Sequence, residues 1–585
     1  MCGIAGYCGE GDRQLVRKML KTISYRGPDD EGVYVDDRAG LGNRRLSIID
    51  LKTGRQPISN EDGSVWIVYN GELYNHLLLR AELEARRHRF VTRSDTEVFV
   101  HAYEEWGPAF VERLRGMYAF ALWDSRKKQL LLARDEAGVK PLYYSLRNGT
   151  LYFGSEIKCM LENKDLPHAL YLPAVDCYFS FGSVFGSQTM FEGIKKLEPG
   201  TYALYSARAK RLTFKRFWRL RFAPSIRSLH EASERLFDLL KESVELQLMS
   251  DVPLGAFLSG GIDSSGVVAF MSKALQRPVR TFTIGFDEES DELTFAREVS
   301  ELFGTHHREK IVEDDDAVRL LPVLPYYFDD LTGDAAAVPT FFVAKLAHRF
   351  VKTVLTGEGG DELFAGYNRY KIFSPWFDFI PKSIRLYFFE SVVSIFQDAH
   401  KRAFYSPRLL AAKRDWSAVF LRPYFEGKVG GLDQALAFGF EQVLPNQLLA
   451  KVDRAAMANS LEARVPLLDK ELATFSGRLF PSLKMSGIQG KFVLRKVMER
   501  ILPKRIIQRP KHGFDVPWQR WFSGEVGEFA EQVFDEGTNN LLLASAVKKE
   551  MRRASFSGKG KKPLMRAWHI LLFELWMRRW FPDEY

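Results

Sequence analysis

The stretch Leu258-Ser259-Gly260-Gly261-Ile262-Asp263-Ser264-Ser265 decides the fold of the second half of the chain. It ends the apolar run 252–258 and opens a helical pattern over 266–275. Glycines let backbone approach a ligand closely, and a helix N-terminus offers unpaired N–H groups. The spacing is neither GxxxxGK[ST] nor GxGxxG, so the usual NTPase and dinucleotide loops are excluded. The stretch predicts a pyrophosphate cradle; a tight strand–helix turn without a ligand is the plainer alternative.

A second glycine-rich stretch, Thr356-Gly357-Glu358-Gly359-Gly360-Asp361-Glu362, follows the apolar run 353–355. Open α/β sheets bind ligands at the carboxyl ends of their strands. Carboxylates beside a pyrophosphate are explained if Mg²⁺ bridges them, because Mg²⁺ prefers oxygen ligands. An acidic surface turn is the alternative.

The segments around these stretches alternate between strand and helix patterns. After an amphipathic helix at 229–248, apolar runs at 252–258, 281–286 and 353–355 alternate with helical patterns at 266–275, 292–303 and 341–350. This alternation predicts βαβ units and a parallel sheet. Beyond residue 370 the pattern is mostly helical. The linker 215–228 separates a first domain, 1–217, from a second, 229–585.

The first domain has mostly strands and turns, which predicts an α+β layered fold. The expected strands are 32–35, 45–49, 65–69, 118–124 and 129–133. The expected helices are 77–87 and a second that starts at Ser94, with Glu97 as a capping-box partner, and runs to Trp106.

Cys2 follows the initiator methionine directly. Removal of Met1 leaves a thiol beside a free α-amine, whose pKa values are about 8.5 and about 7.7–8.0. An amine that serves as base for a thiol is an arrangement used in covalent catalysis. An incidental cysteine at a disordered terminus is the alternative.

Composition narrows the class of protein. The chain has 585 residues, 46% hydrophobic and 27% charged, with only four cysteines. This indicates a globular protein in a reducing, cytoplasmic compartment, and no signal peptide is visible. The apolar segment 564–581 contains charges and is expected to be a packed helix, not a membrane span.

The net charge of +9 permits nucleic-acid binding but does not require it. The densest basic run, Arg552-Arg553 with 559–562, is expected to be a surface loop.

Taken together, these motifs resemble the glutamine-hydrolysing asparagine synthetase family over essentially the whole chain. The supporting N-terminal runs are RGPDD at 26–30, RLSIID at 45–50, YNGELYN at 69–75 and SDTE at 94–97. In the second half they are the two glycine-rich stretches, TIGF at 283–286, KVDR at 451–454, SLEARVPLLD at 460–469, GKFVLR at 490–495 and RPKHGF at 509–514.

The resemblance implies a class II glutamine amidotransferase domain with a four-layer Ntn-hydrolase-like sandwich. It makes Cys2 the nucleophile, with Asn70 and Gly71 as the oxyanion hole. Arg45 would grip the carboxylate of glutamine and Asp95 with Glu72 its ammonium. Surface salt bridges for Arg45 and Asp95, and a hairpin turn at Asn70-Gly71, are the alternatives residue by residue.

The resemblance also implies an α/β ATP-pyrophosphatase domain, like adenine nucleotide hydrolases, with a helical C-terminal part. The residues expected to bind ATP and pyrophosphate are Leu258, Ser259, Gly260, Gly261, Asp263, Ser264, Ile284, Thr356 and Gly357. Glu358, Asp361, Lys491 and Lys511 complete the synthetase site. Asp263 and Asp361 are the candidate Mg²⁺ ligands.

The implied activity is asparagine synthesis from aspartate, glutamine and ATP, which yields AMP, pyrophosphate and glutamate. The implied partners are small molecules, without nucleic acid or membrane, in a possible homodimer. Two departures leave the acceptor open. Asp334-Ala335-Ala336-Ala337 has alanines where relatives commonly carry hydroxyls, and Asn446-Gln447 has amides where acids are frequent. The alternative is therefore a family member that amidates another carboxylate, such as an envelope sugar or a secondary metabolite. A glutamine-binding regulator with an inactive second half is a more distant possibility.

Overall fold

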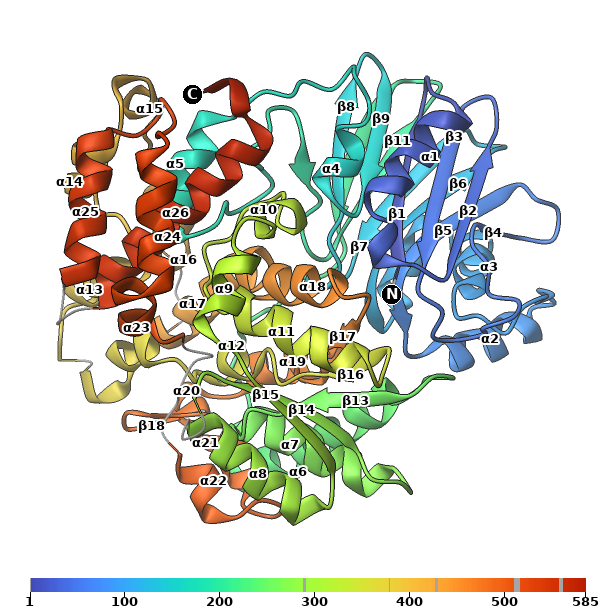
Figure 1. The fold of residues 1–585 in the computed structure, drawn as a ribbon. Helices are drawn as coiled ribbons and strands as arrows, with labels where there is room; N and C mark the ends of the chain where they lie inside the picture. Colours follow the sequence, from blue (N-terminus) through green and yellow to red (C-terminus); the bar gives the residue numbers. More distant parts are fainter. Residues whose placement is uncertain are drawn as a thin grey trace.

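A computed structural model describes residues 2–287, 291–377, 379–426, 430–509, 516–556 and 561–584. The first half forms a sandwich of two antiparallel sheets with helices on both outer faces (Figure 1). The first sheet has the order β10 (Lys195–Lys196), β8 (Tyr143–Arg147), β9 (Thr150–Gly154), β1 (Cys2–Cys8), β3 (Ala39–Arg45) and β2 (Asp30–Val35). The second has the order β12 (Arg211–Arg216), β11 (Thr201–Ser206), β7 (Gln129–Arg134), β6 (Gly116–Asp124), β5 (Val65–Leu73) and β4 (Ile58–Ser59).

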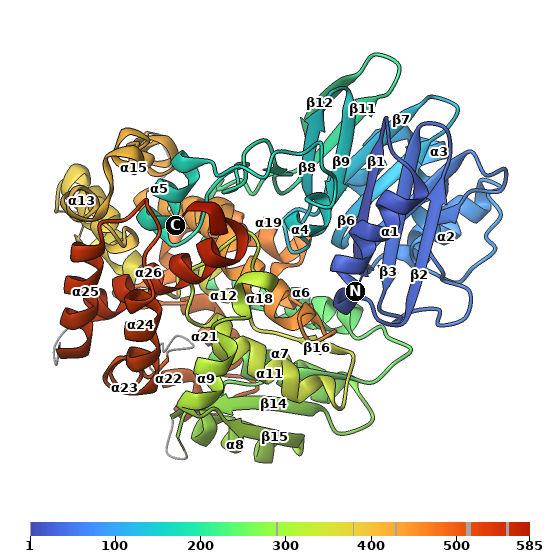
Figure 2. The same cartoon turned by 45° about the horizontal axis from the view of Figure 1, so that its top comes forward.

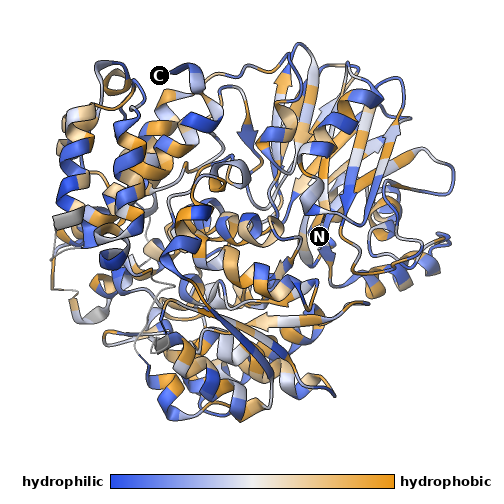
Figure 3. Ribbon diagram, viewed as in Figure 1, coloured by the Kyte–Doolittle hydropathy of each residue, from blue (hydrophilic) through white to orange (hydrophobic). Residues whose placement is uncertain are grey.

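Apolar side chains fill the space between the two sheets. Ile4 and Leu41 of the first sheet belong to one buried cluster with Val68, Ala119 and Trp123 of the second. The helix α1 (Arg13–Thr22) covers the outer face of the first sheet, and α2 (His76–Ala85) and α3 (Glu97–Trp106) cover that of the second. Figure 3 shows hydrophobic and hydrophilic residues mixed along both the strands and the outer helices. The predicted four-layer sandwich is therefore confirmed.

Two local predictions for this half are wrong. Strand β3 ends at Arg45, so residues 46–49 form no strand. The helix α3 begins at Glu97 and has no capping box at Ser94. The Glu97 carboxylate instead accepts hydrogen bonds from the N–H groups of Val91 and Thr92, at 2.7 and 2.6 Å. The backbone of the preceding loop therefore binds the Glu97 side chain that a capping box at Ser94 would have used.

The second half is built on a parallel sheet. Its order is β15 (His306–Ile311), β14 (Arg280–Gly285), β13 (Leu254–Phe257), β16 (Thr353–Leu355) and β17 (Glu462–Arg464). Helices α6 (Leu229–Gln247), α7 (Ile262–Ala274), α8 (Asp291–Phe303), α11 (Ala337–His348) and α18 (Leu449–Met457) pack around it. The strand order reverses between β13 and β16, which pair directly. Both glycine-rich stretches therefore leave adjacent strands at the switch point where such sheets bind ligands.

A bundle of helices completes the C-terminal part, as the mostly helical pattern predicts. It includes α13 (Lys382–Val393), α14 (Asp398–Phe404), α15 (Pro407–Ala411), α17 (Gly431–Phe438), α23 (Trp518–Ser523), α24 (Glu525–Asp535), α25 (Ala544–Phe556) and α26 (Lys561–Trp580). The helix α26 is largely buried, which confirms the expected packed helix. Within the described residues, none of the helices combines the length and apolarity needed to cross a bilayer.

One helix from the first 217 residues lies within this bundle. The helix α5 (Leu172–Phe181) lies beside α26, away from the sandwich strands (Figures 1 and 2). The hydroxyl of Tyr178 donates to the carbonyl of His569 at 3.0 Å. Buried Asp176 pairs with Lys401 of α14 at 2.7 Å. The two halves thus share a core, and the boundaries 217 and 229 stay a prediction.

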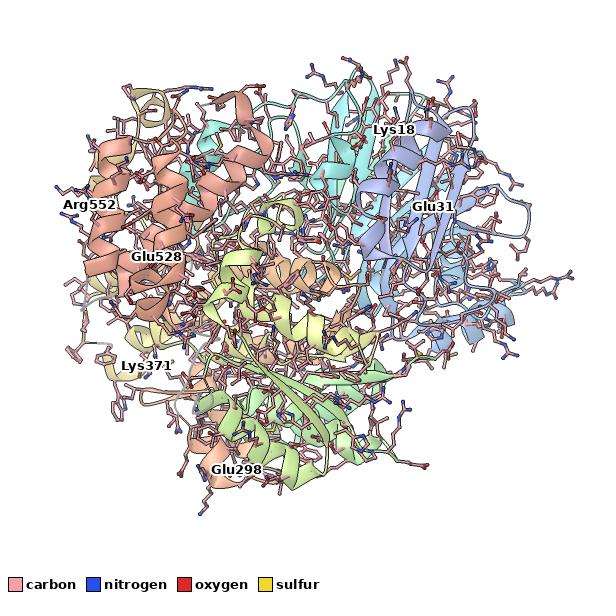
Figure 4. The ribbon with its side chains drawn as sticks, viewed as in Figure 1. Lys18, Glu31, Glu298, Lys371, Glu528 and Arg552 are labelled. Atoms are coloured by element: carbon pink, nitrogen blue, oxygen red, sulfur yellow. The ribbon has the colours of Figure 1, made fainter. Side chains whose placement is uncertain are left out.

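The basic run near the end of the chain differs from the expected loop. Arg552 and Arg553 are exposed residues of α25, and Lys561 begins α26. Figure 4 shows Arg552 at the outer surface. Residue 559 lies outside the described residues. Apolar residues spaced along 544–554, such as Val547, Met551 and Ala554, bury one face of the helix and turn its arginines to solvent.

Candidate active sites in the two halves

Cys2 lies at the start of β1, where its backbone meets the second sheet. Its Cα pairs with that of Arg45 in β3, and its backbone nitrogen donates to Oδ1 of Asn70 in β5 at 3.0 Å. The Nδ2 group of Asn70 is buried and has no hydrogen-bond partner among the described residues. A buried donor without a partner is costly, so this amide is preset to bind an oxygen.

Gly71 is constrained by the neighbouring strand. A Cβ at this position would lie 2.0 Å from the carbonyl oxygen of Met117 in β6, so only glycine fits. Asn70 and Gly71 lie inside β5, opposite Ala119 and Tyr118. The hairpin-turn interpretation of this dipeptide is therefore wrong.

Arg45 and Asp95 lie close to the part of β5 that contains Asn70 and Gly71. Arg45 is 6% exposed and donates to the carbonyls of Ile49 and Asp50 at 2.9 and 2.8 Å. A Cβ on Gly54 would lie 2.5 Å from Nη2 of Arg45 and 3.3 Å from Cβ of Ser94, next to Asp95. The surface salt-bridge interpretation of Arg45 is wrong, because its partners are backbone carbonyls in a buried setting.

Asp95 is buried against the second sheet, which contains β5. Its Oδ2 accepts from the N–H of Leu73 at 2.9 Å and from the hydroxyl of Tyr69 at 3.2 Å. These contacts attach Asp95 to β5, the strand that carries Asn70 and Gly71. The structure therefore brings the predicted glutamine-binding residues together around Cys2.

Glu72 points toward the other half of the chain. Its Oε1 lies 3.3 Å from Nη2 of Arg464 in β17. Burial and the nearby Glu462 raise the pKa of Glu72 well above its usual range, although Arg464 opposes this. An ammonium from glutamine would compete with Arg464 for this carboxylate.

The thiol of Cys2 is itself buried. Burial raises the pKa of Cys2, while the Leu46 backbone and the Arg45 guanidinium oppose the rise. The thiol is therefore neutral at pH 7 and needs a base to become a nucleophile. After removal of Met1, the nitrogen that now donates to Asn70 becomes an α-amine on the same residue.

In the second half, the stretch 258–265 forms the turn that was expected. Gly260 has φ +67°, and a Cβ there would lie 2.4 Å from Cβ of Phe295. The hydroxyls of Ser259 and Ser264 lie 3.1 Å apart. The first turn of α7 has no side-chain cap, so its N–H groups are available to an anion.

The second glycine-rich stretch packs directly on this helix. A Cβ at Gly357 would lie 2.7 Å from the nitrogen of Ser264, and one at Gly360 would lie 2.5 Å from Oδ1 of Asp263. Glycine is therefore required for the close approach of the two stretches. The acidic surface-turn interpretation is wrong, because Asp361 and Glu362 are buried.

Lys491 joins the two stretches. Its Nζ lies 2.5 Å from Oδ2 of Asp263 and 2.6 Å from Oδ1 of Asp361. Lys491 is 3% exposed and directly precedes α21 (Phe492–Met498). The lysine expected at the synthetase site is thus in place, whereas Lys511 lies outside the described residues.

These residues surround a cavity of about 820 Å³. Of the residues expected from sequence, those that line it are Leu258, Ser259, Gly261, Asp263, Ser264, Ile284, Thr356, Gly357, Glu358, Asp361 and Lys491. Gly260 shapes the turn behind them. The size and the mixed polar and apolar lining suit a nucleotide with a second small substrate.

Sequence reasoning missed several residues of this cavity. Lys451 lines it, with Nζ 3.4 Å from Asp334 and 4.0 Å from Glu358. The Nη1 of Arg509 donates to the carbonyl of Ser259 at 2.8 Å. His569 of α26 closes another side. Lys451 and Arg509 belong to the KVDR and RPKHGF runs, which could have identified them; His569 carried no such signal.

Asp263 and Asp361 suit a magnesium ion bound with a phosphate. Both carboxylates approach one ammonium, that of Lys491, beside the serine hydroxyls of the cradle. Hard oxygen donors next to a phosphate site are the ligands that Mg²⁺ prefers. The residues present therefore fit this ion.

The fold and the two sites define a class: an Ntn-type glutamine amidotransferase joined to an ATP-pyrophosphatase-like ligase domain. The family description "Glutamine amidotransferase domain" matches residues 1–218, and "Asparagine synthase" matches residues 235–578. The chain therefore belongs to the glutamine-hydrolysing asparagine synthetase family.

Several curated proteins are similar over more than nine-tenths of their length. "Asparagine synthetase [glutamine-hydrolyzing] 1" of Bacillus subtilis is 32% identical over 100% of this chain and 98% of its own. "Amidase chry2" of Gibberella zeae is 29% identical over 92% of this chain and 93% of its own. Among solved structures, the allosteric regulatory enzyme of purine biosynthesis covers 53% of this chain and 80% of its own at 16% identity, with a TM-score of 0.31.

Proposed function

We propose that the chain makes an amide from a carboxylate, with glutamine as the nitrogen donor and ATP as the activating substrate. The observation that carries this proposal is the contact between the two sites. Glu72 pairs with Arg464, and the carbonyl of Arg464 accepts from the N–H of Thr356 in the nucleotide cavity at 2.9 Å. One buried residue therefore touches both half-sites.

In the first half-reaction, Sγ of Cys2 attacks the side-chain amide carbon of glutamine. Nδ2 of Asn70 and the N–H of Gly71 stabilise the oxyanion. Collapse of the tetrahedral intermediate breaks the C–N bond and releases ammonia. Water then hydrolyses the γ-glutamyl thioester to glutamate. The α-amine of Cys2 takes the thiol proton, through a water, and returns it to the leaving nitrogen.

In the second half-reaction, an oxygen of the acceptor carboxylate attacks the α-phosphorus of ATP and pyrophosphate leaves. The cradle 258–265 holds the pyrophosphate, and Lys491 stabilises its charge. Asp263 and Asp361 would hold Mg²⁺, which neutralises phosphate charge when bound. Ammonia that travels inside the protein from Cys2 then attacks the acyl carbon and displaces AMP.

We propose aspartate as the acceptor, so that the product is asparagine. Family membership and the similarity to asparagine synthetases support this choice. We propose in addition a reducing, cytoplasmic location, which the four free, buried cysteines favour. The homodimer implied by the family resemblance stays a prediction.

One observation favours a second candidate, in which another carboxylate is amidated. Ala335 and Ala336 line the cavity beside Gly333 and His569, so this wall offers methyl groups where hydroxyls would bind a polar amino acid. The test is to incubate the protein with glutamine, ATP, Mg²⁺ and aspartate and to measure asparagine, AMP and pyrophosphate. Equal amounts of the three products support asparagine synthesis. Glutaminase activity without asparagine rejects aspartate as the acceptor.

A further inference from the structure

A cluster of two histidines and two glutamates lies on the outer layer of the sandwich. Glu61 comes from the turn between β4 and β5, His88 from the connection between α2 and α3, and His101 with Glu104 from α3. One side-chain ligand atom from each of the four lies within 4.8 Å of all the others. We call these four residues the His–Glu cluster. The proposed chemistry at Cys2 and in the nucleotide cavity uses none of them.

His101 is the buried centre of this cluster. It is fully buried, and neither of its ring nitrogens has a hydrogen-bond partner among the described residues. Nδ1 lies 3.6 Å from Glu61 and 3.7 Å from Glu104, beyond hydrogen-bond length. A buried polar group without a partner is costly, so the geometry indicates that a ligand belongs among these atoms.

The surrounding contacts orient the cluster inward. Oε1 of Glu61 accepts from the N–H of Arg89 at 2.9 Å, and Oε1 of Glu104 accepts from Nδ2 of Asn60 at 2.7 Å. In both glutamates Oε2 is the atom that faces His101. Metal-binding carboxylates and histidines are commonly held by such outer hydrogen bonds.

The second nitrogen of His101 completes this arrangement. Nε2 lies 3.6 Å from Oε1 of Glu97, whose oxygens are fixed by the N–H groups of Val91 and Thr92. A carboxylate behind a histidine is the usual support for a metal-binding imidazole. Glu97 faces Nε2 across 3.6 Å, and Nδ1 on the other side of the ring faces Glu61 and Glu104.

We propose that the His–Glu cluster binds a zinc ion. Zinc takes four nitrogen and oxygen ligands in a tetrahedron, with bonds of about 2.0–2.2 Å to His and carboxylate ligands. Ligand atoms in such a site lie about 3.4 Å apart, so the cluster closes on the ion through a small shift of the exposed glutamates. Two imidazoles favour a transition metal over Mg²⁺ or Ca²⁺.

Zinc here would fasten three separate segments of the sandwich. They are the turn at Glu61, the connection at His88 and the helix that carries His101. The connection between α2 and α3 also carries Asp95, two residues before α3 begins. The ion therefore stabilises the layer that positions Asp95. Because this role is structural, metal binding can be tested separately from the proposed function.

The alternative is a protonated His101 that needs no metal. Although burial opposes protonation, Glu104, Glu97 and Glu61 raise the pKa of His101 to about 9. The other ionisable groups that face it from neighbouring elements are His88 and, beyond it, Glu105. An imidazolium predicts stability that is insensitive to zinc and is lost as the pH rises through about 9.

The test is the metal content of the full chain, purified without a histidine tag. Elemental analysis after dialysis should find one zinc per chain. Chelation should lower the thermal midpoint by several degrees, and zinc, but not magnesium, should restore it. The variants His88→Gln and Glu61→Gln alter partly exposed ligands, so they remain informative if His101→Gln fails to fold. Each should lower the zinc affinity at least tenfold. The matched control His230→Gln, on an exposed histidine of α6, should bind zinc like the original chain.

Two results would overturn the proposal. One is a folded protein that neither contains zinc nor responds to it. The other is zinc binding that is unchanged in both His88→Gln and Glu61→Gln, because the ion would then lie elsewhere.

Discussion

Cys2 and Asn70 are the residue pair on which the proposed glutamine chemistry depends. The contact between the Cys2 nitrogen and Oδ1 of Asn70 fixes the amide so that Nδ2 is left as a donor. Residues of β5 and β1 supply this pair from opposite sheets. The packed core of the sandwich therefore holds these two residues at hydrogen-bonding distance.

We expect Cys2→Ala to abolish amide synthesis from glutamine, because the variant lacks the thiol that attacks the amide in the proposed mechanism. Synthesis from added ammonium salts should persist, since the nucleotide cavity is untouched. Assays of AMP and amide product with each nitrogen source check this. If ammonium-dependent activity disappears as well, the thiol has a role beyond glutamine hydrolysis.

We expect Lys491→Met to lower the rate of ATP-dependent synthesis by a factor of about 10²–10³, the effect of removing one charge-stabilising donor. Glutamine hydrolysis should remain within a few-fold of normal. Pyrophosphate release and glutamate formation, measured on the same sample, separate the two effects. The control is Lys496→Met, a partly exposed lysine of α21 that pairs with Glu499. A normal rate of pyrophosphate release in Lys491→Met would contradict the assigned role.

Secondary-structure elements were predictable where a face is buried. Strand patterns placed β5, β6 and β7 near their observed positions, and apolar runs placed β13, β14 and β16 of the parallel sheet. The outer strands β15 and β17 of that sheet were not predicted. The strand expected at 45–49 was wrong because backbone carbonyls of residues 49 and 50 bind the Arg45 side chain instead of pairing in a sheet. The position of α5 in the C-terminal bundle was also beyond sequence reasoning. Its partners, such as Lys401, lie more than two hundred residues away.

The helix α26 gives a prediction about acid stability. Burial lowers the pKa of His569 to about 4, against an ordinary value of 6.5. Between pH 6.5 and 4 the unfolded chain therefore binds the proton more readily than the folded chain. Stability should fall as the pH falls through this window and level off below it, by about 3 kcal/mol in total from this group.

The variant His569→Asn removes this titration while its amide can still donate to the Met565 carbonyl, as Nδ1 does at 2.6 Å. We expect its thermal midpoint to be less sensitive to pH between 6.5 and 4 than that of the original chain. Thermal unfolding at half-unit pH steps checks this. Parallel curves for the two proteins would show that His569 titrates normally.

At the scale of the whole molecule, the two halves are joined by buried charges. Nη2 of Arg26 donates to Asp453 of α18 at 2.8 Å, and Nη1 donates to Glu156 at 2.7 Å. In both Figure 1 and Figure 2 the N-terminus lies where the sandwich meets α18 and the parallel sheet. Ammonia released at Cys2 would therefore start its path at this junction.

Arg464 is the residue through which the two sites touch. Arg464→Met should remove the guanidinium that pairs with Glu72 and Glu462 and disturb the backbone contact to Thr356. We expect the ratio of glutamate formed to amide formed to rise several-fold above one. Simultaneous measurement of both products checks this, with Arg478→Met, an exposed position at the end of α19 (Lys470–Arg478), as the control. An unchanged ratio in a folded Arg464→Met protein would show that the contact does not couple the sites.

The central claim is that the nitrogen released from glutamine at Cys2 travels inside the chain and is used in the second half-reaction. Isotope transfer tests this claim most directly. Glutamine labelled with ¹⁵N in its amide is supplied with ATP, Mg²⁺, aspartate and an excess of unlabelled ammonium, and the product amide is analysed by mass spectrometry. We predict that the asparagine carries mainly ¹⁵N and that AMP forms in equal amount. Asparagine with the isotope ratio of the bulk ammonium, or labelled glutamine hydrolysis without AMP, would contradict the account.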